Sequence, residues 1–502
     1  MRKSLNTVVW GSAGLGGQVG NEAMDGSIFR AYDIRGIAGI TLTHGVVRAI
    51  GNAFGAVVRE GTDKRRTKIA VGRDGRHSSP WIESSLVDGL TRAGVDVFLI
   101  GLGPTPMLYF AENHLGCDAA VMVTGSHGPP NCNGLKFTLG CAPFSGERIR
   151  ELATLARSAF QKQTRGQSRT ADVSGAYVSR LLADSVSGRH LDVVWDAGNG
   201  AAGSVLHDLV AGLPGRHMIL FGEVDGAFPH RGPDSAVAEN LGALAASVIE
   251  HGADVGIAFD GDGDRIGVVD DEGKPVAGDE LLALLAADVL CARPGATVIA
   301  DVKASRVLFD EIARLGGMPL MWRTGHAPIK EKMMEIGCPL AGEVSGHMYF
   351  ADRYYGFDDG LYAAVRLLNI LSARRAGLAS FRKSLPRAVN TPEVRIACDD
   401  GRKWVVVEEV RARLTARGAD MVAIDGVRVS VAGGWWLLRA SNTGPALVAR
   451  CEAVDEIGLE RVWRDLAVAV TPSGVELPAD LEFGRGVAQL QPEIGREPDS
   501  RP

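Results

Sequence analysis

The sequence predicts an α/β fold: three similar α/β domains with mixed, largely parallel sheets, followed by a C-terminal α+β domain. The first observation is a repeat, because three segments of the chain each read as strand, helix, glycine and strand. The second is that each segment then adds another helix and a third strand, as crossover connections between parallel strands require. The third is a change of pattern after Leu385-Pro386, where short strands are joined by turn signals that favour antiparallel hairpins.

The repeats begin and end with apolar runs that are typical of strands inside a sheet with both faces covered. They extend from KIAVGRDGR (68–76) to VDVFLIG (95–101), from LDVVWDAGNG (191–200) to HMILFGEVDG (217–226), and from VIADVKAS (298–305) to MPLMWRTGH (318–326). The helices between the strands have apolar residues three or four positions apart.

These patterns divide the chain into domains. We expect α/β domains over 24–171, 172–274 and 275–386, an α+β domain over 387–481, and mobile ends over 1–23 and 482–502.

Composition limits the function classes. The chain has 502 residues, 46% of them hydrophobic and 23% charged, and its net charge of -6 offers no broad basic field for nucleic acid or an anionic membrane. No apolar run approaches the ~18 residues of a membrane span. The seven cysteines form no CxxC pair, which indicates reduced thiols and a cytoplasmic protein.

Three distinctive loops follow the third strand of each repeat: TGSH (124–127), DGDGDR (260–265) and GEVSGH (342–347). Ligands bind at the carboxyl ends of parallel strands, because helix N-termini and loop amides converge there. If the domains face a common cleft, these loops meet.

DGDGDR indicates a metal site. Three aspartates alternating with glycine can direct three carboxylates at one point, and oxygen ligands alone favour Mg²⁺. An EF-hand is excluded because its sixth position is Arg265 and its twelfth is Asp271. A solvated acidic turn is the alternative. A secreted Ca²⁺-binding protein would rest on DGDGD alone.

Ser126 is a candidate nucleophile. The hydrolase elbow G-x-S-x-G needs glycine where this chain has Thr124, so acyl transfer is weakened. A serine near a Mg²⁺ site suits phosphoryl transfer, and His127 and Lys136 are close enough in sequence to serve it.

Two further segments look like anion-binding loops. SIFRAYDIRG (27–36) contains Arg30, Tyr32 and Arg35, and RASNTG (439–444) offers an arginine, two hydroxyls and an amide. An ordinary hairpin loop remains the alternative for RASNTG.

Five motifs in this order, FRAYDIRG, TGSHGPPNCNGLKF, FDGDGDR, GEVSGH and RASNTGP, resemble the functional segments of the α-D-phosphohexomutase family, in particular its bacterial phosphomannomutase/phosphoglucomutase branch. The resemblance covers about residues 27–470. It implies a four-domain, heart-shaped enzyme around a central cleft, with Ser126 as a phosphoserine.

The resemblance also implies roles for individual residues. The catalytic group would be Ser126, His127, Lys136, Arg35, Arg265 and His347, and Mg²⁺ would be held by Ser126, Asp260, Asp262 and Asp264. Substrate would be bound by Tyr32, Lys303, Thr324, Gly325, His326, Glu343, Ser345, His347, Arg439, Ser441, Asn442 and Thr443.

The activity implied is the reversible conversion of hexose 1-phosphate and hexose 6-phosphate, of mannose or glucose, through a hexose 1,6-bisphosphate that turns over between two transfers. Lys136, His347 and Arg35 are the candidate general bases. We expect small-molecule sugar phosphates as the partners of a monomeric enzyme.

The chain departs from the family at Gly128, where asparagine is usual, and this predicts an altered rate or metal dependence. Phosphoglucosamine mutase is disfavoured by Val344 and by TGSH in place of TASH. A sugar-phosphate-binding relative with weakened catalysis is supported only by Gly128.

Overall fold

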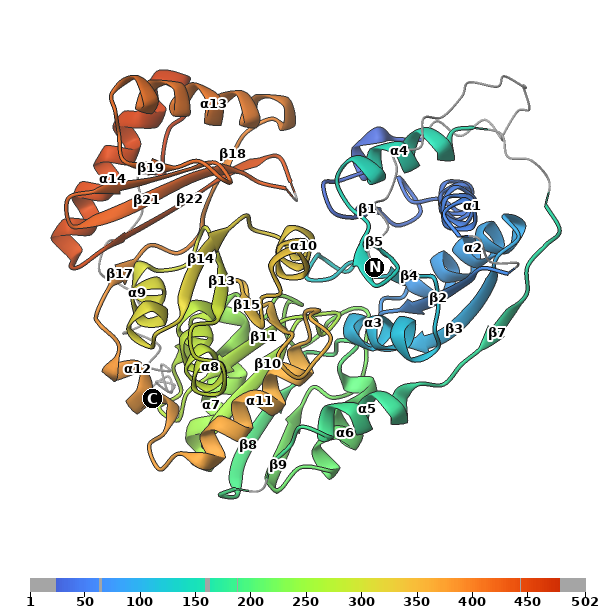
Figure 1. Ribbon diagram of the computed structural model, residues 1–502, viewed down its shortest axis with the longest axis horizontal. Coiled ribbons are helices and arrows are strands. Elements are labelled where there is room, and N and C mark those ends of the chain that lie inside the picture. Colours follow the sequence, from blue (N-terminus) through green and yellow to red (C-terminus); the bar gives the residue numbers. More distant parts are fainter. Residues whose placement is uncertain (1–23, 63–65, 159–162, 187, 443, 479–502) are drawn as a thin grey trace, which may run out of the picture.

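The computed structural model describes residues 24–62, 66–158, 163–186, 188–442 and 444–478. Within these ranges the chain forms four sheets with helices packed against them (Figure 1). The predicted architecture of three similar α/β domains and a C-terminal α+β domain is confirmed. The predicted mobile ends lie outside the described residues.

The repeat in the sequence is also a repeat in topology. In each α/β sheet the first strand of the repeat lies between the second and third strands, and both run parallel to it. The strands, given as first, second and third, are β2 (Lys68–Arg73), β3 (Asp96–Leu102) and β4 (Ala119–Val123); β8 (Leu191–Asp196), β9 (Gly215–Leu220) and β10 (Val255–Phe259); and β13 (Thr297–Asp301), β14 (Met318–Trp322) and β15 (Leu340–Gly342). The predicted crossover helices are α2 (Ser79–Arg92), α3 (Thr105–His114), α6 (Gly203–Ala211), α7 (Gly242–His251), α9 (Arg306–Arg314) and α10 (His326–Ile336).

An antiparallel strand follows each third strand and makes the sheets mixed. These strands are β5 (Cys132–Leu139), β11 (Ile266–Val269) and β16 (Met348–Phe350), paired with β4, β10 and β15. Each distinctive loop therefore joins two paired strands, which fix its backbone at both ends.

The remaining elements extend the sheets and cover them. They are β1 (Ile34–Ile37), β6 (Ala142–Pro143), β7 (Ser168–Thr170) and β12 (Pro275–Val276), with η1 (Gly26–Ile28), η2 (Ala238–Leu241), α1 (His44–Glu60), α4 (Glu147–Ala156), α5 (Ser174–Leu182), α8 (Gly278–Ala292), α11 (Gly360–Ala373) and α12 (Leu378–Ser384). Side chains cap several helices; Thr43, for example, accepts from the Val46 amide at the start of α1. β12 pairs with β11, so the second sheet extends to Val276, two residues beyond the predicted end of the second domain at position 274.

The fourth domain is an antiparallel sheet with two long helices packed on it, as its hairpin signals predict. Its elements are β17 (Val389–Asn390), β18 (Val394–Ala397), α13 (Asp400–Ala416), β19 (Met421–Val422), β20 (Val427–Val431), β21 (Gly434–Ala440), β22 (Ala446–Ala453), α14 (Glu456–Val470) and η3 (Thr471–Ser473).

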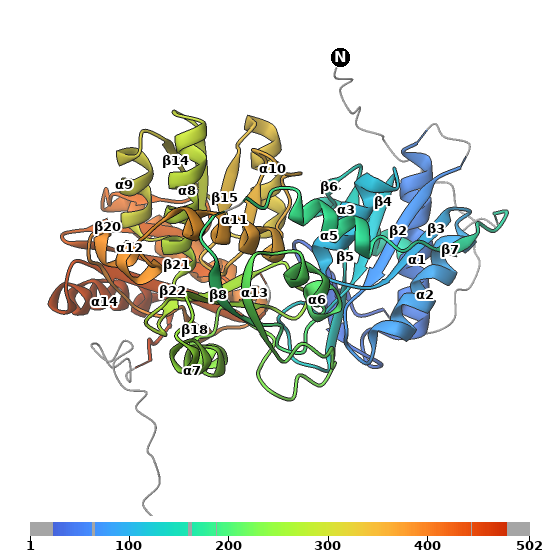
Figure 2. The same cartoon turned by 90° about the horizontal axis from the view of Figure 1, so that it is seen from below.

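The hydrophobic cores do not follow the four domains one to one. Domain I and domain IV each have a core of their own, whereas one large core joins domains II and III and includes α3 of domain I. The aromatic rings of α3 show this connection, because Tyr109 lies 5.4 Å from Phe357 and Phe110 lies 5.7 Å from Tyr177. Figures 1 and 2 both show domain I at one side of the molecule, next to the joined domains II and III. In the part of the chain that the structure describes, no helix is long and apolar enough to cross a membrane.

Candidate active site

The distinctive loops lie at the carboxyl ends of their third strands, and side-chain contacts connect them. Lys136 on β5 of domain I reaches Asp262 and Asp264 in the loop of domain II. Arg265 of that loop forms a bridge pair with His347 of domain III. A Cβ at Gly261 of that loop would come within 2.5 Å of the Ser126 carbonyl, so the three loops meet as predicted.

Ser126 is buried in a strained turn between β4 and β5. Its side chain and backbone are 2% exposed, and its φ of 50° lies in the left-handed region that non-glycine residues rarely adopt. The Ser126 amide donates to Thr124 Oγ1 at 2.8 Å, which holds this conformation, and Ser126 Oγ lies 3.2 Å from His127 Nδ1. Such strain is concentrated at functional sites.

His127 stands beside the serine as a neutral imidazole. Burial lowers its pKa well below the usual range, and the positive charges of Arg265, Arg35 and Lys136 lower it further.

The three aspartates of DGDGDR are completely buried, and each keeps one oxygen that no described residue hydrogen-bonds: Asp260 Oδ2, Asp262 Oδ1 and Asp264 Oδ1. One carboxylate oxygen from each aspartate lies within 4.8 Å of the others. Burial and the neighbouring carboxylates raise the pKa of Asp260 well above its usual range. Three converging, unpartnered carboxylate oxygens fit a hard divalent cation.

Positive side chains surround this acidic group. Lys136 Nζ donates to Asp262 at 2.7 Å and to Asp264 at 2.5 Å, and Thr105 Oγ1 donates to Asp262 at 2.6 Å. Burial alone would lower the pKa of Lys136, but the two carboxylates outweigh it and raise that pKa well above its usual range. The Lys136 ammonium therefore stays protonated.

Arg35 reaches the site through strand pairing. In the β1–β5 pairing, Arg35 lies opposite Gly134, and Gly134 is two residues before Lys136 on the same strand. The Nε of Arg35 donates to Asp33 at 2.7 Å. Burial would lower the pKa of Arg35, but Asp33 outweighs it and the pKa is raised, so the guanidinium is a fixed positive charge.

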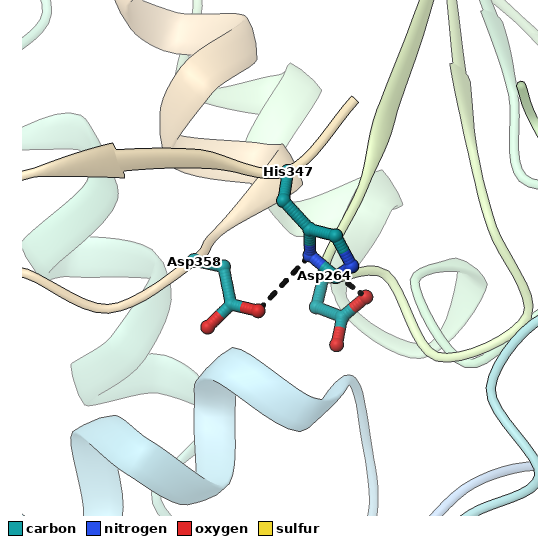
Figure 3. Close-up of side chains that lie close together, drawn as sticks. All are labelled: Asp264, His347 and Asp358. Atoms are coloured by element: carbon teal, nitrogen blue, oxygen red, sulfur yellow. Dashed lines mark ion pairs between the residues drawn. The ribbon is translucent and has the colours of Figure 1, made fainter. Parts of the chain in front are cut away.

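His347 lies between two buried carboxylates, Asp264 and Asp358 (Figure 3). The Nδ1 of His347 is 3.0 Å from Asp358 and 3.6 Å from Asp264. These three side chains are close enough together that they could also hold a metal ion. Arg265 Nε, however, donates to His347 Nε2 at 3.0 Å, so the imidazole hydrogen lies on Nδ1 and faces the carboxylates. The group is better described as an oriented histidine than as a metal site.

The third loop brings together residues predicted to bind sugar. Glu343 is buried and accepts from the Gly325 amide at 2.9 Å and from Tyr349 Oη at 2.6 Å. Ser345 lies half-buried in the same loop, and the Lys303 ammonium donates to Glu393 at 3.0 Å.

Thr324 and His326 lie at the start of α10, next to this group. Thr324 Oγ1 donates to Asp301 at 3.2 Å. Both ring nitrogens of His326 are buried and have no hydrogen-bond partner in the described ranges, and burial together with the Lys330 charge lowers the pKa of His326 well below the usual range. These nitrogens are available to a ligand.

The fourth loop lies between β21 and β22. Arg439 donates from Nε to Asp425 at 3.0 Å, while its buried Nη2 has no hydrogen-bond partner among the described residues. Ser441 is 2% exposed, and Asn442 donates to Tyr32 Oη at 3.2 Å, which in turn donates to the Thr324 carbonyl at 3.3 Å. Thr443 lies outside the described residues.

Sequence reasoning missed several residues that position these groups: Asp74, Arg76, Thr105, Lys330 and Asp358. Asp74 and Arg76 lie within the quoted segment KIAVGRDGR, directly after β2. The rule applied to the third strands, that functional loops follow strand ends, would have identified them if applied to the first strand. Thr105 lies three residues after the second strand, β3, so the same rule would have reached it there, whereas Asp358 follows no such pattern.

A buried serine beside converging carboxylates and fixed positive charges is typical of phosphoryl transfer rather than acyl transfer. Comparison with known proteins agrees with this class. Models of the four phosphoglucomutase/phosphomannomutase domains match residues 26–162 (α/β/α domain I), 175–273 (domain II), 277–389 (domain III) and 393–468 (C-terminal domain).

Individual relatives match over most of the chain. The phosphomannomutase/phosphoglucomutase of Pseudomonas putida is 43% identical over 91% of this chain and 98% of its own, and the phosphoglucomutase of Neisseria gonorrhoeae is 43% identical over 87% and 95%. A crystal structure of a phosphoglucomutase/phosphomannomutase family protein from Burkholderia thailandensis has a TM-score of 0.84 and 42% identity, covering 91% of this chain and all of that one. The chain therefore belongs to the phosphoglucomutase/phosphomannomutase family, and it is an isomerase of the phosphohexomutase type.

Proposed function

We propose that this enzyme moves a phosphoryl group between the 1 and 6 positions of mannose and glucose phosphates, with Ser126 as the phosphoryl carrier. The observation that carries the proposal is that the Ser126 loop packs against the DGDGDR loop, which has three unpartnered carboxylate oxygens: a Cβ at Gly261 would come within 2.5 Å of the Ser126 carbonyl, and Lys136 on the following strand donates to Asp262. The names of the P. putida and N. gonorrhoeae relatives support mannose and glucose phosphates as substrates.

Asp260, Asp262 and Asp264, with phosphate on Ser126, would hold Mg²⁺. When bound, the ion would offset negative charge on the transferring phosphoryl group. Lys136 and Arg265 would hold the phosphoryl oxygens, since both keep their positive charges inside the site.

In the first transfer the bond between Ser126 Oγ and phosphorus breaks as a bond forms from the free sugar hydroxyl to phosphorus. The hydroxyl proton goes to a general base, and Ser126 Oγ takes up a proton as it leaves phosphorus, so serine is released as a free hydroxyl. Arg35 and Lys136 have raised pKa values and keep their protons, so His347 is the remaining candidate, and it could take the proton only at Nε2, in place of the hydrogen bond from Arg265. His127, neutral beside Ser126 Oγ, would accept hydrogen bonds at the serine end.

The second transfer runs in reverse, after the hexose 1,6-bisphosphate has turned over. The phosphate that is not reacting would be held by Arg439, whose buried Nη2 is without a partner, and by Ser441 and Asn442. Glu343, Ser345 and His326 would contact the sugar in both orientations. Added hexose 1,6-bisphosphate would therefore activate the enzyme by phosphorylating Ser126.

Sugar phosphates are the only partners that the proposal needs, and a monomer suffices because all the proposed groups come from one chain. We propose a cytoplasmic location, because the cysteine pattern of the sequence indicates reduced thiols.

The test is an assay of mannose 1-phosphate, glucose 1-phosphate and glucosamine 1-phosphate with Mg²⁺ and catalytic hexose 1,6-bisphosphate. We expect turnover of the first two sugars and much less of the third. Preference for glucosamine 1-phosphate would favour phosphoglucosamine mutase, and binding without turnover would favour the catalytically weakened relative.

A further inference from the structure

Arg76 is buried behind the serine loop and uses every hydrogen-bond donor that it has. It is 1% exposed and follows β2. A guanidinium carries five N–H donors in a fixed plane. One donates to Asp74 Oδ2 at 3.1 Å, and the other four donate to backbone carbonyls of a single loop.

The four carbonyls lie along the loop that carries Ser126. Nη2 donates to the carbonyls of Ser126 at 2.7 Å and Gly128 at 2.6 Å. Nη1 donates to the carbonyls of Pro129 at 2.5 Å and Cys132 at 3.0 Å. One side chain thus holds the loop from the nucleophile to the start of β5.

The guanidinium is itself held from two directions. The fully buried Asp74 accepts from Thr124 Oγ1, from the Gly125 amide and from Ser79 Oγ as well as from Arg76. On another side the Arg76 guanidinium carbon lies 5.2 Å from the centre of the Phe228 ring, which belongs to domain II.

Glycine is required next to this arrangement. A Cβ at Gly125 would come within 2.5 Å of the Arg76 guanidinium, and a Cβ at Gly261 in the metal loop would come within 2.5 Å of the Ser126 carbonyl. Both glycines therefore permit close approach of Arg76, the serine loop and the metal loop.

We propose that Arg76 is a positioning residue for phosphoryl transfer: its guanidinium holds the carbonyls of the serine loop so that Ser126 Oγ points at the incoming sugar hydroxyl. This role rests on the proposed function. Within the part of the chain that the structure describes, Arg76 hydrogen-bonds to neither the substrate-binding residues nor the carboxylates of the metal loop, so it affects the rate of transfer and leaves substrate binding nearly unchanged.

The test compares Arg76→Lys with a matched control, Arg366→Lys. Lysine keeps the charge at position 76 but has three donors on one nitrogen and cannot reach four carbonyls. Arg366 is also 1% exposed, donates to Asp352 and Asp288, and lies over the Phe350 ring in the shared core. We expect Arg76→Lys to lower kcat by about 100-fold, because a small displacement of a nucleophile has an effect of that size.

We expect KM for glucose 1-phosphate to change by less than about threefold in Arg76→Lys, and hydrogen exchange of residues 124–134 to become faster. In Arg366→Lys kcat and the exchange of 124–134 stay at the wild-type level. Equal kcat values in the two variants, or a loss in Arg76→Lys that appears only in KM, would overturn the proposal.

A milder variant keeps the test decisive if Arg76→Lys does not fold. Phe228→Leu removes the ring beside the guanidinium, and we expect kcat about threefold lower with unchanged KM and faster exchange of 124–134. Unchanged kcat and exchange would contradict the role of Arg76. If the wild-type enzyme itself shows no turnover, the proposed function fails, and the exchange of 124–134 still decides whether Arg76 holds the loop.

Discussion

The region that carries Ser126 and the region that carries Arg439 differ in how they are joined to the rest of the molecule. At the first, Lys136 of domain I donates to two aspartates of domain II, and α3 of domain I packs into the core shared with domains II and III. At the second, the loop belongs to a domain with its own core. That domain contacts domain I through Asn442 and Tyr32, and through an ion pair of Arg30 with Asp400 at 3.2 Å.

The junction of domain IV with domain III combines arginines that donate to backbone carbonyls with a small buried apolar cluster of Val302, Trp435 and Leu437. Arg428 donates to the carbonyls of Val302 and Ala304, and Arg450 donates to the Lys303 carbonyl. Residues that would transfer phosphate thus lie where α3 of domain I enters the core shared with domains II and III, whereas residues that would hold the second phosphate belong to domain IV, which has its own core and a smaller apolar junction. This division suits a reaction in which the intermediate must turn over between two transfers.

The largest effect is expected from a substitution in the region that carries Ser126. Asp262→Asn removes the negative charge that would face both Lys136 and the cation. We expect kcat to fall by about 10² to 10³-fold, which is the usual effect of losing one electrostatic contact to a transition state. Steady-state turnover of glucose 1-phosphate measures it. Asp208→Asn, an exposed carboxylate on α6, is the control and should have wild-type kcat. A change in KM alone would show that the region is not fixed for catalysis.

A substitution in the region that carries Arg439 should instead weaken the binding of substrate. Arg439→Ala removes a buried guanidinium with a free Nη2, and a hydrogen bond to a charged group contributes about 1.5 to 3 kcal/mol. We expect KM to rise by about 10 to 100-fold, with a smaller fall in kcat. Arg461→Ala, an exposed residue of α14 in the same domain, should leave both constants unchanged. A large fall in kcat at constant KM would place Arg439 in the transfer step.

A smaller change tests the contact between the two regions. Tyr32→Phe removes the hydroxyl that donates to the Thr324 carbonyl and accepts from Asn442. One neutral hydrogen bond contributes about 1 kcal/mol, so we expect KM to rise by about fivefold. Tyr355→Phe, on a half-exposed ring, is the control. An unchanged KM would mean that this contact does not close the domains on substrate.

The smallest effect is expected at Gly128. Its carbonyl is held by Arg76, which limits the backbone freedom that glycine would otherwise add. Its φ is not in the left-handed region, but a Cβ there would lie 3.0 Å from the Gly125 carbonyl oxygen. We expect Gly128→Asn to change kcat or the Mg²⁺ requirement by about two- to threefold. Gly401→Asn, where a Cβ meets no atom within 4 Å, is the control. Identical kinetics in Gly128→Asn and wild type would contradict the sequence prediction for this position.

The fold could be predicted largely because its information is local. Apolar runs ending at TGSH, DGDGDR and GEVSGH mark strand ends, and the crossover rule turns them into parallel sheets. The sequence does not predict the antiparallel strands β5, β11 and β16, because a short buried run after a loop has no periodicity that distinguishes a strand from a helix. The shared core could not be predicted either, since the packing of α3 against domain II depends on domain arrangement.

For the site, motifs identified the residues with distinctive chemistry, and geometry supplied their neighbours. Arg76 and Thr105 act through contacts with residues 50 or more positions away, at Ser126 and Asp262. No spacing in one sequence reveals such pairs. His347 was found from its motif, but its orientation depends on Arg265 and Asp358, which only the structure brings together.

The central claim is that Ser126 carries the phosphoryl group, and the most direct measurement is peptide mass analysis of the purified enzyme after incubation with glucose 1,6-bisphosphate and Mg²⁺. The account predicts one phosphate on the peptide that contains Ser126 and its loss when excess glucose 1-phosphate is supplied. Ser126→Ala should carry no phosphate and should lose kcat by about 10⁴-fold or more. Phosphate on another residue, or full turnover by Ser126→Ala, would contradict the account.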